Sequence, residues 1–116
     1  MKPLSRLLLF FLLALAAPVI FAVTEYSETL SRAQWPEEVN GTNISAIPQV
    51  SQILRLFVED ENITLEIHYP NNDLGKQWAE SLGYWLVTFG IPIHYVKLFA
   101  DSGAADQIVI SLVDRR

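Results

Sequence analysis

The sequence of 116 residues contains no cysteine, and this absence excludes several kinds of protein. A small domain without cysteine has no disulfide, so its hydrophobic core alone must stabilise it. It also has no thiol nucleophile and no cysteine that could carry a lipid. The common signatures of a nucleophilic serine, of a zinc protease and of a phosphate-binding loop are absent as well. We therefore expect a protein that is not an enzyme, with no catalytic, cofactor-binding or metal-binding residues.

Basic residues are also scarce, with eight Lys and Arg against thirteen Asp and Glu. Two of the eight, Lys2 and Arg6, lie within the first 22 residues, so the rest of the chain has six against thirteen and a net charge of −7. An acidic domain does not attract the phosphates of nucleic acids and is repelled by anionic lipid headgroups. We expect other proteins as partners, and no nucleic acid.

The N-terminal residues resemble a targeting segment rather than part of a folded domain. Lys2 and Arg6 precede an apolar run that starts at Leu7, and the run ends on the small residue Ala22. This order is typical of a secretory signal peptide, which predicts cleavage after Ala22 and export to the periplasm. The alternative is a retained anchor, because the 17 residues from Leu7 to Val23 are just long enough to approach a bilayer span.

Residues 23–45 are polar and show no sustained period of 2 or 3.6 residues. This pattern predicts an extended arm in front of a folded domain that comprises residues 46–116. The arm contains Trp35, followed by a proline. Its indole could contact a partner, or it could anchor the arm on the domain.

The domain itself begins with apolar residues at helical spacing, which predict a helix from Pro48 to Val58 or Glu59. Strict alternation then predicts a strand over 63–69. A second helix is predicted from Leu74 to Phe89, where Gly90 is suited to a left-handed cap and a proline follows closely. Two more strands are expected, over 94–99 and 107–113.

This order predicts an α+β fold, with a small mixed three-stranded sheet and two helices packed on one of its faces. The strand–helix–strand unit favours a parallel crossover, and the last two strands are expected to pair as a hairpin. The apolar stripe of the second helix contains Trp78 and Trp85, which we interpret as core residues. Tyr84 lies opposite this stripe and is a candidate contact residue.

Histidines and carboxylates could in principle form a site. If the first two strands are neighbours, Glu66, His68 and His94 could approach one metal ion. Two isolated histidines do not form a paired ligand motif, so no metal site is predicted. The remaining carboxylates are interpreted as surface charges, including Asp73 with Glu80 and Asp101 with Asp106.

Several short motifs resemble a family of small exported proteins that bacterial integrating conjugative elements encode. These motifs are the Trp-Pro pair, the strand that ends on Tyr69-Pro70, the run from Gly75 to Leu82, the Trp-Leu-Val at 85–87 and the Gly-Ile-Pro at 90–92. The resemblance implies a role in the periplasmic part of a DNA-transfer apparatus. Our leading hypothesis is therefore a non-enzymatic periplasmic accessory protein of such an apparatus.

The layout from residue 52 to residue 99 is also similar to that of OmpA-like peptidoglycan-binding domains. That family has Gly-His-Thr-Asp after its first strand and Arg-Ala in the following helix. The corresponding stretches here read HYPN at 68–71 and QWA at 77–79, with neither the aspartate nor the arginine. A cell-wall-binding module is the alternative hypothesis, and no site residues are carried over from that family.

Overall fold

The computed structural model describes residues 23–116, and the predicted signal peptide lies outside these described residues. The elements are β1 (Val23–Ser31), η1 (Arg32–Gln34), α2 (Gly41–Ser45), α3 (Pro48–Leu56), β2 (Ile63–His68), α4 (Asp73–Thr88), η2 (Ile93–Tyr95), β3 (Val96–Phe99) and β4 (Gln107–Asp114). The predicted α+β class is confirmed. Among residues 23–116, no helix is long and apolar enough to cross a bilayer.

The sheet has four strands in the order β1-β4-β2-β3. β3 is parallel to β2, as the predicted crossover requires, and β4 is antiparallel to both β1 and β2. The expected hairpin between β3 and β4 is wrong. The apolar side chains of β4 explain this, because Ile108 and Ile110 are fully buried and favour the centre of the sheet. The more exposed β3 takes the edge.

The fourth strand comes from residues 23–45, which were expected to form an arm. β1 pairs with β4 along its whole length, from Val23 opposite Asp114 to Ser31 opposite Gln107. Leu30 is fully buried in the core. Most other residues of β1 are exposed, and only one face position needs an apolar side chain. The alternation of apolar and polar residues that identifies a strand is therefore nearly absent from its sequence.

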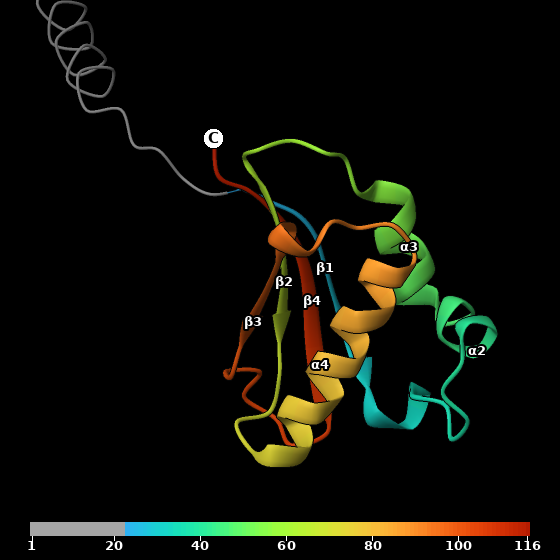
Figure 1. The fold of residues 1–116 in the computed structure, drawn as a ribbon. Coiled ribbons are helices and arrows are strands. Elements are labelled where there is room, and N and C mark those ends of the chain that lie inside the picture. The colour runs from blue at the N-terminus through green and yellow to red at the C-terminus, as the bar shows by residue number, and fades with distance from the viewer. Residues whose placement is uncertain (1–22) are drawn as a thin grey trace, which may run out of the picture.

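The helices lie on one face of the sheet (Figure 1), as predicted. Pro48 is the first residue of α3, a position where its missing N–H is not needed. This helix ends at Leu56, earlier than expected, because Phe57 is already in the extended conformation. Together the helices and strands enclose a core of aliphatic side chains with Trp78 and Tyr95.

Both ends of α4 are fixed by local contacts. At its start the side chain of Asn72 accepts a hydrogen bond of 2.7 Å from the N–H of Gly75. At its end Gly90 has a φ of 115°, and the N–H of Ile91 donates to the carbonyl of Leu86 at 3.1 Å. These contacts form a Schellman-type cap, so the predicted stop at Gly90 is confirmed.

Gly75 also fixes the connection between β2 and α4. A Cβ atom at Gly75 would lie 2.1 Å from the carbonyl oxygen of Pro70, which is far inside van der Waals contact. Only glycine therefore allows the first turn of α4 to approach the end of β2 this closely. This approach fixes where α4 starts relative to the end of β2.

Candidate partner-binding edge

A groove lies between α4 and the edge strand β3. It has a volume of about 400 Å³ and is open to solvent. Its lining comes from α4, η2 and β3, and consists of Glu80, Gly83, Tyr84, Val87, Ile93, Val96 and Leu98. Six of these seven residues are apolar, glycine or aromatic, so the groove is suited to apolar side chains.

The strand and the helix place these residues for simple reasons. Val96 and Leu98 pair with Leu65 and Ile67, whose side chains are fully buried on the helix side of the sheet. Since side chains alternate along a strand, Val96 and Leu98 point to this side as well. Gly83 of α4 is buried beside them and has no side chain to fill the space. The groove therefore exists because α4 carries glycine where it faces β3.

Large apolar side chains gather at this edge. Among residues 23–116, nine large hydrophobic residues are exposed, and four of them lie on or beside β3. Their exposed fractions are 74% for Ile93, 65% for Tyr84, 39% for Leu98 and 37% for Phe99. The first three line the groove, whereas Phe99 stacks on His68. Exposed apolar residues that cluster in this way mark an interaction surface better than scattered ones do.

The backbone of β3 is also open at this edge. The carbonyl of Phe99 accepts a hydrogen bond of 2.8 Å from the N–H of Tyr69, on the side of β2. Backbone groups of successive strand residues point to opposite sides, so the N–H and carbonyl of Leu98 point away from β2. No strand among the described residues pairs with β3 on that side.

The structure separates the two contact residues that the sequence suggested. Tyr84 lines the groove, with its ring edge-on to Trp85 at 5.4 Å. Trp35 is half-buried and packs edge-on against Trp78, with ring centroids 6.2 Å apart. Trp35 is thus an anchor of the polypeptide on the core, the other role considered for it.

Sequence reasoning missed Ile93 and Leu98 as members of this edge. Residues 94–99 were expected to form one strand, whereas η2 occupies Ile93–Tyr95 and β3 starts only at Val96. The N–H of Tyr95 bonds to the carbonyl of Pro92 at 3.1 Å, which tightens the chain into this turn. One signal was present in the sequence. The segment from Ile91 to Phe99 contains more apolar residues than one buried face can take, so some of them must be exposed.

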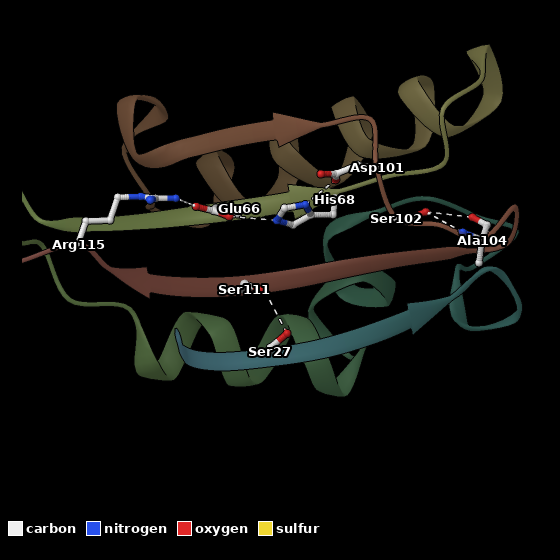
Figure 2. Close-up of polar contacts among 8 residues, drawn as sticks. All are labelled: Ser27, Glu66, His68, Asp101, Ser102, Ala104, Ser111 and Arg115. Atoms are coloured by element: carbon white, nitrogen blue, oxygen red, sulfur yellow. Dashed lines mark hydrogen bonds and ion pairs between the residues drawn. The ribbon is translucent and has the colours of Figure 1, made fainter. Parts of the chain in front are cut away.

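The opposite face of the sheet carries a row of charged groups. Figure 2 shows Asp101, His68, Glu66 and Arg115 lying in this order along β2. His68 Nδ1 is 2.6 Å from an oxygen of Asp101, and His68 Nε2 is 3.0 Å from an oxygen of Glu66. Arg115 forms an ion pair with the other oxygen of Glu66. The imidazole also stacks on Phe99, with centroids 4.9 Å apart.

Glu66 is the buried member of this row. Burial raises the pKa of its carboxyl. Hydrogen bonds from Arg115 and His68, together with their charges, lower this pKa by more than burial raises it. The net pKa of Glu66 is therefore below its ordinary value, and the carboxylate is ionised in the folded protein. The row links the end of β2, together with Asp101 two residues after β3, to Arg115 directly after β4.

This row does not form the metal site considered from the sequence. The two carboxylates approach opposite nitrogens of His68, so the three groups do not converge on one point. His94 lies in η2 at the start of β3, whereas His68 pairs with Phe99 at its end. Within residues 23–116, no three His, Cys, Asp or Glu residues are placed to hold a metal ion together.

Comparison with known proteins finds no match to any protein-family model, curated protein or solved structure. The groove and the row of charged groups are therefore interpreted from their own contacts. The row places its charges in pairs on a flat strand face, whereas the groove combines a hollow, apolar lining and free backbone groups. We take the groove, together with the free edge of β3, as the candidate functional site.

Proposed function

We propose that this chain is a non-enzymatic interaction protein that acts in the periplasm as an accessory of a conjugative DNA-transfer apparatus. The observation that carries the interaction role is the apolar groove between α4 and β3. The resemblance of its short motifs to exported proteins of integrating conjugative elements supports the cellular context. Protein partners fit this surface better than nucleic acid does, because the residues from 23 onward carry a net charge of −7.

Exposure of Ile93 and Tyr84 gives the proposal its physical basis. An isoleucine at 74% exposure and a tyrosine at 65% exposure leave apolar area in water that a partner would cover. Each fully covered side chain of this kind contributes about 1.5 to 3 kcal/mol to an association. Such residues at the centre of a contact are the ones whose loss weakens binding most.

Transfer of the element between cells tests this role. We expect Ile93→Asp and Tyr84→Asp to reduce the transfer frequency as strongly as deletion of the gene does. The matched controls are Leu74→Asp and Val58→Asp, because Leu74 and Val58 are exposed to 75% and 65% but lie outside the groove. These controls are expected to transfer like the unchanged protein.

Two results would contradict the proposal in different ways. If deletion leaves transfer unchanged, the assigned apparatus is wrong. If deletion abolishes transfer but Ile93→Asp and Tyr84→Asp do not reduce it, the groove is not the functional surface. Sedimentation with purified peptidoglycan tests the alternative role, because retention of both groove variants on the cell wall would favour a cell-wall-binding module.

A further inference from the structure

We infer that the groove takes an extended segment of a basic partner protein, which adds to the sheet as a strand beside β3. This inference rests on the proposed function and specifies its mode of binding. The partner segment would carry apolar residues at alternate positions and a Lys or Arg near Glu80. Backbone contacts, side-chain space and charge each support one part of this description.

The backbone of β3 is ready for a further strand. The carbonyl of Phe99 accepts a hydrogen bond from Tyr69 and so points to β2. The N–H and carbonyl of the preceding residue, Leu98, therefore point to the free edge. The N–H of Val96 is already bonded to the carbonyl of Ile93, so the open donor on this edge is that of Leu98. A partner strand that exchanges hydrogen bonds with Leu98 would extend the sheet by β-augmentation.

The groove matches one face of such a strand. A strand added beside β3 directs every second side chain to the side of the sheet where α4 lies. There it meets Tyr84, Ile93 and Leu98, around a floor formed by Gly83. A volume of about 400 Å³ holds a few side chains rather than a domain surface. The hollow thus favours an extended segment over a flat globular face.

Charge and size identify the occupant as a partner rather than a second copy of this chain. The described residues carry a net charge of −7, which attracts a basic protein and repels another copy. Glu80 lines the groove with its side chain 55% exposed. Its Oε1 lies 4.0 Å from Nζ of Lys76, and its other carboxylate oxygen can meet a cation of the segment. A stable dimer buries about 800 Å² on each partner, whereas β3 offers only four residues for pairing.

Selection of random-sequence peptides displayed on phage against the purified chain tests this mode directly. We expect the selected peptides to show alternate apolar residues with Lys or Arg, and to lose binding to Ile93→Asp but not to Leu74→Asp. Leu98→Pro and Leu98→Ala then form a matched pair. Both remove the leucine side chain, but only proline removes the N–H at the free edge, and an edge strand tolerates proline there.

We expect Leu98→Pro to bind the selected peptides about tenfold more weakly than Leu98→Ala does, since the variant leaves a partner carbonyl unpaired. Equal binding by these two variants would overturn strand addition while leaving the groove as the contact surface. Circular dichroism of both variants checks that the fold is retained. If Leu98→Pro does not fold, N-methylation of the peptide backbone, residue by residue, replaces it.

Other outcomes decide against the inference as well. If the selected peptides bind Ile93→Asp as well as the unchanged chain, or if no binding peptides are obtained, an extended segment is not the occupant of the groove. Self-association that Ile93→Asp abolishes would identify a second copy of this chain instead. The transfer assay stays independent of these results, so failure of strand addition and failure of the proposed function are distinguishable.

Discussion

The two edge strands of the sheet differ in how well they are protected against pairing with a further strand. β1 has nine residues and β3 has four, yet the longer strand is the better protected. The side chain of Gln49 donates a hydrogen bond of 2.9 Å to the carbonyl of Thr29 on β1. A register shift between Thr24 and Tyr26 further disrupts this edge. Both devices discourage the addition of another strand.

The grooves beside the two edges differ in chemistry too. One hollow between β1 and α3 is lined by Tyr26, Glu28, Pro48, Gln49 and Gln52, which are mostly polar. A second hollow, beside the start of β1, has Leu56, Val58, Ile63 and Leu112 in its lining. The groove between β3 and α4 is apolar except for Glu80. Where Gln49 protects β1, the hollow beside it is polar, whereas β3 combines an open backbone edge with an apolar groove. The combination on β3 is suited to binding. The state of each edge, rather than its length, is the reason why we propose β3 as the binding edge.

The largest expected effect concerns the anchoring of β1. Leu30→Ala should lower the free energy of unfolding by about 2 to 5 kcal/mol, because Leu30 is fully buried and leaves a cavity. Leu98→Ala on β3 should cost less than about 1 kcal/mol, since Leu98 is 39% exposed. Urea unfolding followed by circular dichroism measures both. Similar losses of unfolding free energy in the two variants would show that β1 and β3 are equally important for stability, and would contradict a division into a structural edge and a binding edge.

Low pH should reduce the stability of the fold through Glu66, on the sheet face opposite the helices. The pKa of Glu66 is lowered in the folded protein, so its stabilising contribution is complete above its ordinary value of 4.5 and is lost as the pH falls below it. Glu66→Gln should lower the free energy of unfolding at neutral pH by about 1 to 3 kcal/mol and flatten its dependence on acid.

The matched control for this prediction lies on the β1 side of the same face. Ser27 accepts a hydrogen bond of 3.1 Å from the hydroxyl of Ser111, and neither group is charged. Ser27→Ala should therefore leave the loss of stability between pH 5 and pH 3 (about the range in which carboxylates titrate) as it is in the unchanged protein. Urea unfolding at several pH values gives both slopes. An unchanged slope for Glu66→Gln would show that another group controls the acid response.

A smaller effect is expected at the floor of the β3 groove. Gly83→Ala should raise the free energy of unfolding by about 1 kcal/mol, since alanine is the better helix former. The added Cβ would lie 3.7 Å from Val96 and 3.9 Å from Ile67, which is ordinary contact. The same methyl group narrows the groove, so binding of selected peptides should weaken while thermal stability rises. Loss of stability instead would mean that close packing requires the glycine.

The smallest effect is expected at the protected edge. Gln49→Ala removes the hydrogen bond to the carbonyl of Thr29, and a single exposed bond of this kind contributes about 0.5 kcal/mol. Analytical ultracentrifugation of this variant also tests whether Gln49 protects the edge. We expect some self-association that a further change on β1, Ser27→Pro, abolishes. No self-association at any concentration would leave the register shift as the main protection.

Prediction from the sequence succeeded where local patterns are strong. The alternation before Pro70 located β2, and the apolar stripe with Gly90 located α4 and its end. It failed for β1, since among its residues only Leu30 is fully buried and polar neighbours hide the period. It also placed β3 and β4 side by side, although neighbouring strands in the sequence need not pair. Tyr84 was suggested as a contact residue because it lies opposite a clear stripe, and in the structure it lines the groove.

The sequence alone thus determined the class of fold, the end of α4 at Gly90 and the acidic charge, because propensity, capping and charge depend on residues near one another in the chain. Only the tertiary structure decided which strands lie at the edges and which apolar residues stay exposed. Ile93 and Ile91 have the same side chain, but one is 74% exposed and the other is 3% exposed. That difference depends on how α4 packs against β3, where Gly83 lies close to Val96, and this contact joins residues of two separate elements.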